Sequence, residues 1–314
     1  MKKLLLALLV SSGLSLSAIF VYAETAQEYF DQGMAFSKQG NLAQAVVCYT
    51  KAIGFKPDFV EIYYLNRGSA YGKQGSYVQA IADFSKAIEL KPTFADAYCL
   101  RGLTYGKQGN YTLAIADLDK AIQLKPDQED AYCSRSTIYS ILGNLTQAIS
   151  DLTKALDLNP DNALALCNLS LVYNKQGDYG SAIADSTRAI QLKPDFAEAY
   201  SSRGDSYSKL GKFAQAISDY AKAIKLNPHD VQAYNNCGIA YGKQGNPVQS
   251  LVYFAKAIEL NPNYPNAYAD RSIAYYTLKN YAMAWADVRK AEDLGFKVPE
   301  GFLGKLKKDS GRDK

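Results

Sequence analysis

Charged side chains recur in pairs along this chain, and their types and spacing could support ion-pair chemistry. In five places an Arg is followed sixteen residues later by an Asp. The pairs are Arg67 with Asp83, Arg101 with Asp117, Arg135 with Asp151, Arg203 with Asp219, and Arg271 with Asp287. A guanidinium can bind a carboxylate through two parallel hydrogen bonds. The regular spacing favours structural ion pairs inside a repeated unit, and the alternative is that each Arg binds a carboxylate of a partner.

Other residues that could catalyse a reaction or bind a metal are few and scattered. The chain has one histidine, His229, and five cysteines, of which Cys99, Cys133 and Cys167 are each 34 residues apart. Packed helices lie about 8–10 Å apart, and a disulfide needs Cα atoms within roughly 7 Å. We therefore expect thiols rather than disulfides, and no metal or cofactor. With no catalytic constellation in the sequence, the chain is predicted not to be an enzyme.

A strict proline period identifies the elements that must position these residues. The prolines are Pro57, Pro92, Pro126, Pro160, Pro194, Pro228 and Pro262. Their intervals of 34 or 35 residues are typical of a stack of repeats. In each unit, apolar residues lie three, four and seven positions apart on both sides of a Gly, which predicts two amphipathic helices. The Gly should end the first helix in a left-handed conformation, and the Pro should follow the second helix. Pro247 is predicted in the first turn of a second helix, where proline is tolerated.

The residues of one unit carry a family resemblance. They are Tyr64, Arg67, Gly68, Tyr71, Gly75, Ala80, Phe84, Ala87 and Pro92. This pattern resembles the tetratricopeptide repeat (TPR), and the resemblance covers eight consecutive units from about Ala26 to Phe296. It implies an all-α fold for residues 24–296, a right-handed superhelical solenoid of antiparallel helix pairs. The eighth unit departs from the pattern, because it has Lys279 in place of Gly and lacks the terminal Pro.

Three units depart from the Arg–Asp pairing. The first unit has Gln32 and Cys48 at the two positions, and the seventh has Cys237 and Tyr253. The fifth unit has Leu169 and Asp185, so it retains only the acid. The joint presence or loss of both residues elsewhere predicts a bridge between the two helices of one repeat. Because burying two charges is expensive, we expect the bridge to orient the helices more than it stabilises them.

The resemblance also implies a concave groove that is lined by the first helices and binds proteins or peptides. Its candidate residues here are Lys73, Lys107, Cys133, Thr137, Lys175, Ser201, Asp205, Lys209, Asn235 and Lys243. Apolar and short polar side chains at these helix positions suit an extended peptide or a partner helix. The lysines have two interpretations. They could attract an acidic partner along one edge of the groove, or they could simply favour the negative end of each helix dipole.

The two ends of the chain differ from the repeats. Residues 1–23 join Lys2 and Lys3 to an apolar run and end in Ala23, which predicts a secretory signal peptide cleaved before Glu24. An uncleaved membrane anchor is the alternative. Either would export the repeats, so we expect a periplasmic or extracellular bacterial protein. Residues 297–314 predict a helix that starts near Pro299 and caps the eighth repeat, followed by a basic tail.

The charge distribution argues against nucleic-acid binding. The formal net charge is +4, but both ends are basic and residues 24–296 sum to about −1. Nucleic-acid binding needs a dense basic stripe, which is lacking. The sequence therefore predicts an exported, non-catalytic scaffold or adaptor that binds protein or peptide partners, with no membrane contact beyond an N-terminal anchor. The alternative hypothesis is a self-assembling structural protein of the cell envelope.

Overall fold

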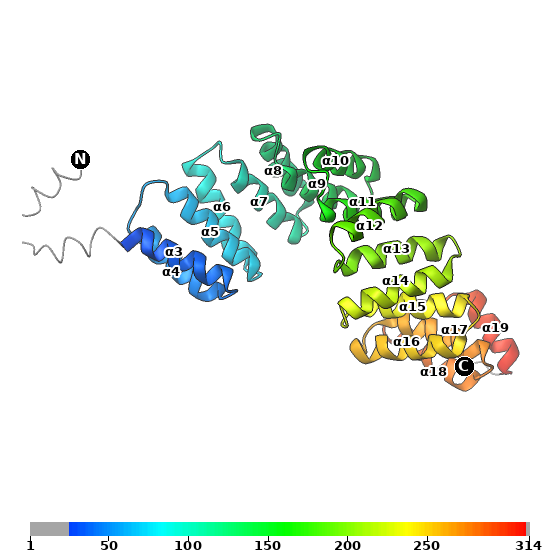
Figure 1. Ribbon diagram of the computed structural model, residues 1–314. Helices are drawn as coiled ribbons and strands as arrows, with labels where there is room; N and C mark the ends of the chain where they lie inside the picture. The colour runs from blue at the N-terminus through cyan, green and yellow to red at the C-terminus, as the bar shows by residue number, and fades with distance from the viewer. Residues whose placement is uncertain (1–24, 312–314) are drawn as a thin grey trace, which may run out of the picture. The chain divides into compact units, whose positions relative to one another are not determined.

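The computed structural model describes residues 25–311, and every regular element in that range is an α-helix (Figure 1). The predicted signal peptide, residues 1–23, lies outside the described residues. The helices are α3 (Thr25–Lys38), α4 (Leu42–Gly54), α5 (Val60–Lys73), α6 (Tyr77–Leu90), α7 (Ala95–Lys107), α8 (Tyr111–Leu124), α9 (Glu129–Ile141), α10 (Leu145–Leu158), α11 (Ala163–Gln176), α12 (Tyr179–Leu192), α13 (Ala197–Lys209), α14 (Phe213–Leu226), α15 (Val231–Lys243), α16 (Pro247–Leu260), α17 (Pro265–Thr277), α18 (Tyr281–Asp293) and α19 (Glu300–Ser310). The predicted all-α fold is confirmed. None of the helices between residues 25 and 311 has the length and apolar character needed to cross a lipid bilayer.

The helices follow one another as pairs, each pair being one repeat. Repeat 1 is α3 and α4, and repeat 8 is α17 and α18. The chain divides into two compact units between α9 and α10, one ending at Gly143 and one beginning at Asn144. Within each unit, the two helices of a repeat pack together, and the second helix also packs on the first helix of the next repeat. This is the solenoid packing that the repeat pattern predicts.

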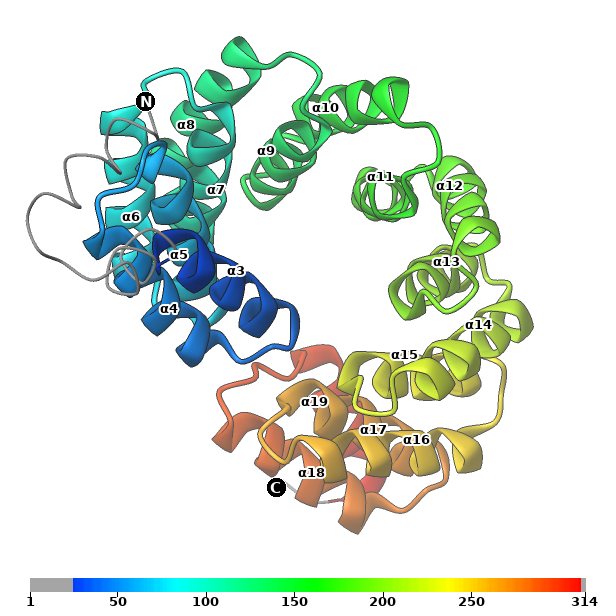
Figure 2. The same cartoon turned by 60° about the vertical axis from the view of Figure 1, so that its left-hand side comes forward.

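The first helices of neighbouring repeats also contact each other. In the first unit α5 contacts α7, and in the second unit α13 contacts both α11 and α15 (Figure 2). The second helices of successive repeats make no comparable contact in the described parts of either unit. Within each unit, the first helices therefore form a continuous face, because they lie closer together than the second helices do.

Backbone conformation at the helix ends follows the sequence pattern. Gly75 and Gly109 follow first helices with φ values of 80°, in the left-handed region that favours glycine. Lys279 takes the same turn in repeat 8 with a φ of 58°, so the turn persists where the glycine is missing. Pro247 occupies the first turn of α16, as predicted, and the Asn246 side chain caps that helix by accepting from Gln249 N.

Small residues allow the two helices of a repeat to approach closely. Gly204 on α13 faces the Tyr220 ring on α14, and a Cβ on Gly204 would lie 2.8 Å from Tyr220 Cε1. Gly68 faces Phe84 in the same way, also at 2.8 Å. An interior glycine costs a helix about 1 kcal/mol relative to alanine. Glycine recurs at these positions because an aromatic ring of the second helix occupies the space that a larger side chain would need.

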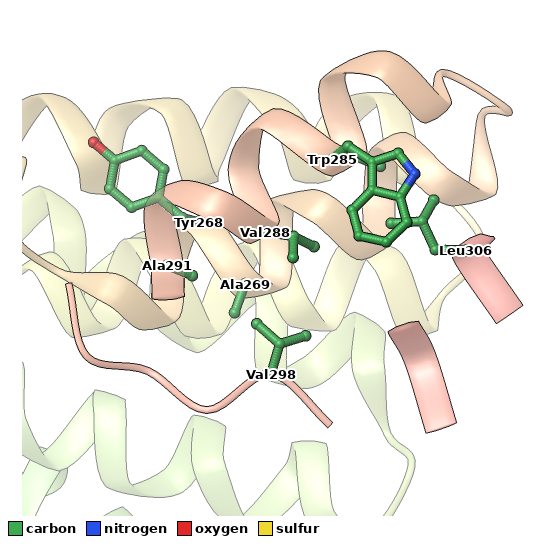
Figure 3. Packing of buried hydrophobic residues seen from close by; sticks show 8 residues of the cluster. Tyr268, Ala269, Trp285, Val288, Ala291, Val298 and Leu306 are labelled. Atoms are coloured by element: carbon green, nitrogen blue, oxygen red, sulfur yellow. The ribbon is translucent and has the colours of Figure 1, made fainter. Parts of the chain in front are cut away.

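The last helix covers the apolar end of repeat 8. Leu306 on α19 is fully buried in a cluster with Trp285 and Val288 of α18, and Val298 joins them from the connecting segment (Figure 3). Trp285 Nε1 donates a hydrogen bond to Ser310 Oγ, at 3.1 Å. The helix begins directly after Pro299, which is its N-cap residue. These contacts remove from water the apolar surface that α18 would otherwise expose.

Candidate functional site

Four repeats contain a bidentate Arg–Asp pair that joins their two helices. Arg101 of α7 donates from Nε to Asp117 Oδ2 at 2.7 Å and from Nη2 to Asp117 Oδ1 at 2.9 Å. The same two bonds, all between 2.7 and 2.9 Å, join Arg67 to Asp83, Arg203 to Asp219, and Arg271 to Asp287. The four carboxylates are buried. Arg135 and Asp151 belong to different units, and their pairing stays a prediction.

A third hydrogen bond ties the guanidinium to the preceding repeat. Arg101 Nη1 donates to Ser85 Oγ of α6 at 2.9 Å, although the sequence analysis assigned no role to this hydroxyl. Equivalent bonds run from Arg67 to Thr50 and from Arg203 to Thr187. The signal lies in the sequence, because each acceptor stands two positions after the Asp position of its own repeat. Each of these arginines therefore links three helices from two repeats.

Tyrosine rings flank the guanidinium groups. The Cζ atom of Arg67 lies 5.4 Å from the ring centre of Tyr64 and 6.0 Å from that of Tyr71, three positions before and four after it. Arg271 lies in the same way between Tyr268 and Tyr275. These are cation–π distances. The hydrogen bonds from Arg67 to Asp83 raise the pKa of the guanidinium above its ordinary value. The bidentate edge of each of the four guanidiniums is occupied by its own Asp.

Repeat 7 replaces the ion pair by aromatic packing. Tyr253 takes the Asp position, and its ring stacks on Tyr241 with the ring centres 5.2 Å apart. Cys237 takes the Arg position and is fully buried, and this burial raises the pKa of the Cys237 thiol to about 12. All five cysteines are thiols, as predicted. Both charges are absent in this repeat, so none is left without a counterion.

Repeat 5 keeps a carboxylate without its arginine. Asp185 of α12 is half-buried and has no hydrogen-bond or ion-pair partner among residues 25–311, while Leu169 of α11 fills the Arg position and is buried. Burial raises the pKa of Asp185 to about 6; Arg188 opposes this rise and Asp178 adds to it. The nearby Arg188 is engaged elsewhere, because its Nη2 donates to Asp161 Oδ1 and to Pro160 O. Sequence reasoning identified the mismatch but not the carboxylate's lack of a partner.

The predicted groove residues lie on first helices. The exposed members are Lys73, Lys107, Thr137, Lys175, Lys209 and Lys243. Cys133, Ser201 and Asp205 are half-buried. Asn235 is only 3% exposed, so its side chain lies behind the surface and not on it. The lysines occupy the last turns of α5, α7, α11, α13 and α15, where they also face the negative end of the helix dipole.

A buried polar network underlies this face in the second unit. Asp205 accepts a hydrogen bond from the Tyr220 hydroxyl at 2.6 Å and another from Asn236 Nδ2 at 3.0 Å. Asn235 Nδ2 donates to Asp270 Oδ2 at 2.9 Å. Burial raises the pKa values of both carboxylates, and their hydrogen-bond donors oppose that rise. Sequence reasoning missed Tyr220, Asn236 and Asp270, because their partners lie on neighbouring helices.

Apolar side chains are exposed on the same first helices. Leu164 is 55% exposed and Leu171 is 39% exposed, and both lie on α11 seven residues apart. Lys175 follows Leu171 by four residues, which places all three on one side of the helix. Leu103 and Lys107 repeat this arrangement on α7. The first-helix face thus combines apolar contact area with a lysine in the last turn of α5, α7, α11, α13 and α15.

Comparison with known sequences identifies the repeat. A family profile described as TPR repeat matches residues 33–75, 68–109, 137–177, 171–211 and 204–245, and one described as tetratricopeptide repeat matches residues 95–128 and 231–264. Together these matches cover more than half of the chain. The chain belongs to the tetratricopeptide repeat family. A search of curated proteins found no match to this TPR chain.

Solved structures share the TPR fold. A tetratricopeptide repeat protein from Parabacteroides merdae ATCC 43184 has a TM-score of 0.63 at 20% identity, with 80% of this chain and 99% of that chain covered. The APC/C hetero-tetramer Cut9–Hcn1 gives 0.64 at 21% identity, with 68% of this chain and 42% of that chain covered, so this TPR chain spans less than half of it. A thermophilic TPR protein in Thermus thermophilus gives 0.50 at 26% identity, with 57% and 98% covered. A TPR array of this kind is typical of scaffolds for protein–protein interaction.

Residues that ligate metals do not gather in the described part of the chain. No group of three or more His, Cys, Asp or Glu side chains between residues 25 and 311 could hold a metal ion. His229 lies in the turn before α15, apart from the first-helix face.

Proposed function

We propose that this TPR protein is an exported, non-catalytic adaptor that binds an extended peptide or a helix of a partner protein on its first-helix face. The proposal concerns each unit by itself, and the second unit, with α11, α13, α15 and α17, supplies most of the observations. The expectation of export rests on the signal-like character of residues 1–23 in the sequence. It favours a partner in the periplasm or outside the cell.

The observation that carries the proposal is the exposure of large apolar side chains on helices whose other surfaces are packed. Leu164, Leu171 and Ile273 are each at least 39% exposed on first helices. Single exposed apolar residues are ordinary. Here they lie on α11 and α17, the two ends of a series in which α11 contacts α13, α13 contacts α15 and α15 contacts α17. Exposed positions along such a series suit a ligand that runs across the helices. The lysines in the last turns favour acidic residues in that ligand.

Charge reversal on this face tests the proposal. The first-helix variant reverses three exposed lysines in the second unit: Lys175→Glu, Lys209→Glu and Lys243→Glu. The matched control reverses three exposed lysines on the second helices: Lys154→Glu, Lys225→Glu and Lys290→Glu. Both variants change the net charge equally. Because the charge of Lys209 lowers the pKa of Asp205 in the buried network, circular dichroism first checks that each variant folds like the wild type. Each full-length protein is used to capture partners from an envelope extract of its host.

We expect the wild type and the control to retain the same partner, and the first-helix variant to lose it. If all three proteins retained the partner equally, the lysines would not belong to the binding site. Their positions would then be explained by the helix dipole alone. The self-assembly alternative gives a different result, because the wild type then sediments as an oligomer and captures only copies of itself.

A further inference from the structure

Four repeats show how this protein binds a guanidinium group. The carboxylate of the second helix accepts two parallel hydrogen bonds, as Asp219 does from Arg203. In three of these repeats a hydroxyl of the preceding repeat accepts a third bond, as Thr187 does from Arg203. A tyrosine ring lies against the flat face of the group, as Tyr200 does at 5.7 Å. Carboxylate, hydroxyl and ring together form a binding site that recognises the planar, forked shape of arginine.

Repeat 5 keeps a carboxylate, a hydroxyl and one of the two ring positions, but it lacks the arginine, and Leu166 replaces the tyrosine that precedes the arginine by three residues. Asp185 stands at the carboxylate position, Thr153 at the hydroxyl position and Tyr173 at the ring position that follows the arginine by four residues. All three belong to the second unit, on the adjacent helices α10, α11 and α12. Leu169 replaces the arginine. The repeat therefore keeps the acceptors and has no donor of its own for them.

The side chain of Leu169 cannot occupy the place of a guanidinium. Leucine ends two bonds beyond its Cβ atom, whereas the guanidinium of arginine begins three bonds beyond it. The accessibility of the carboxylates agrees with this difference. The arginine-bound Asp83, Asp117, Asp219 and Asp287 are buried, whereas Asp185 is half-buried and accessible. Thr153 is exposed as well.

Among residues 25–311 no cation forms an ion pair with Asp185, although the charge of Arg188 opposes the rise in the pKa of its carboxylate. Arg188, three positions after Asp185 on the same helix, is bonded to Asp161 and to Pro160 O. Asp178 caps the start of α12 through Ser181 and adds negative potential. The pKa of Asp185 is raised to about 6 mainly by burial, which is the behaviour of a carboxylate that lacks a counterion.

We propose that repeat 5 is a binding site for the arginine side chain of a protein partner, with Asp185 accepting two hydrogen bonds, Thr153 accepting a third and Tyr173 packing against the guanidinium. The partner arginine takes the role that Arg67, Arg101, Arg203 and Arg271 fill in their own repeats. Lysine is a poorer ligand, because its ammonium group lacks the fork and the flat face. This site lies where the two helices of the repeat meet, and it does not depend on the proposed function of the first-helix face.

Binding of a small guanidinium probe tests the site directly. The full-length protein is labelled with ¹³C at the aspartate carboxyl carbons and titrated with methylguanidinium at pH 7.5, where Asp185 is ionised. A parallel titration uses methylammonium. We expect a saturable shift of the Asp185 signal, with an affinity for methylguanidinium at least three-fold above that for methylammonium.

Two variants separate the site from general charge attraction. Asp185→Asn removes the acceptor charge with almost no change of shape. Because this variant also loses the Asp185 carboxyl signal, its probe binding and that of the wild type are followed by the ¹³C-labelled ring of Tyr173, and the saturable response of that ring should disappear in the variant. Leu169→Arg supplies a guanidinium within the chain, so the response should disappear and the pKa of Asp185 should fall from about 6. Asp293→Asn, a change at an exposed acid at the end of α18 in the same unit, should leave the response unchanged. An unsaturable response, equal affinity for the two probes, or a full response in either site variant would overturn the proposal.

Discussion

Removing one member of an Arg–Asp pair should destabilise the protein more than removing both. The pair for this test is Arg101 and Asp117, because all three hydrogen bonds of its guanidinium are present. In Asp117→Leu the guanidinium keeps only its bond to Ser85 and stays partly buried without a counterion. In the double variant Arg101→Leu with Asp117→Leu, neither charge is left in the interface, and two leucines fill it.

The structure sets the size of the effect. Breaking a buried ion pair by removing one partner costs about 3–5 kcal/mol. The side chain of Arg101 is 19% exposed and that of Asp117 is 11% exposed. Because water reaches part of the remaining guanidinium, we expect the lower end of that range, about 3 kcal/mol, for Asp117→Leu. Replacement of both charges by apolar residues is often nearly neutral, so we expect about 1 kcal/mol or less for the double variant. The coupling free energy is then about 2 kcal/mol.

Urea unfolding followed by circular dichroism at about 222 nm measures the four corners of this cycle. The wild type, both single variants and the double variant should share one m-value, so that differences in midpoint report differences in stability. Asp127→Leu controls for the loss of one negative charge, because Asp127 is exposed in the following turn. Equal destabilisation by Asp117→Leu and by the double variant would refute the argument, since the unpaired guanidinium would then carry no penalty.

Three further predictions follow from other parts of the structure. Asp185 holds its proton more tightly in the folded chain than in the unfolded chain, so its contribution to stability is present below the ordinary pKa of 3.8 and is lost as the pH rises through about 6. Unfolding at pH 4 and at pH 7.5 should therefore show Asp185→Asn to be more stable than the wild type only at pH 7.5. Gly204→Ala should lower the unfolding free energy by about 1–3 kcal/mol because its Cβ meets the Tyr220 ring, whereas Gly301→Ala, at an open position of α19, should not lower it. Leu306→Ala should cost about 2–5 kcal/mol locally, and a shift of Trp285 fluorescence at low urea, before the main transition, would show that α19 has detached.

The regular part of this fold could be predicted from the sequence. The proline and glycine periods mark where each helix pair ends, and Gly75 and Gly109 adopt the left-handed conformation that their positions require. The joint occurrence of Arg101 and Asp117 predicts a contact, because both residues serve one function and are lost together elsewhere. Such inferences succeed when the interacting residues lie within one repeat.

Contacts between repeats were harder to predict. Ser85 accepts from Arg101 of the following repeat, yet Ser85 has no fixed chemical partner in its own repeat. Asn235 stands at a groove position, but its side chain turns to Asp270 of the next first helix and is buried. The direction of such a side chain depends on the neighbouring repeat, which differs in sequence from place to place. For this reason the face could be located from the sequence, but the residues that support it could not.

Repeats that lose the Arg–Asp pair lose both of its charges, and repeat 5 is the exception. Repeat 7 loses both charges, and Tyr253 fills the interface by stacking on Tyr241, so the loss is compensated within the repeat. Repeat 5 loses only the arginine, and Asp185 stays half-buried without a counterion. In natural proteins, residues that conflict with their local structural environment tend to occur at functional sites. Because replacing Asp185 with an uncharged residue would relieve the cost at neutral pH, the retained carboxylate is best explained by a cation that reaches it from outside the chain. The Leu169→Arg variant distinguishes a binding site from a repeat that is merely defective. In a defective repeat the new arginine would raise the free energy of unfolding without any loss of partner binding.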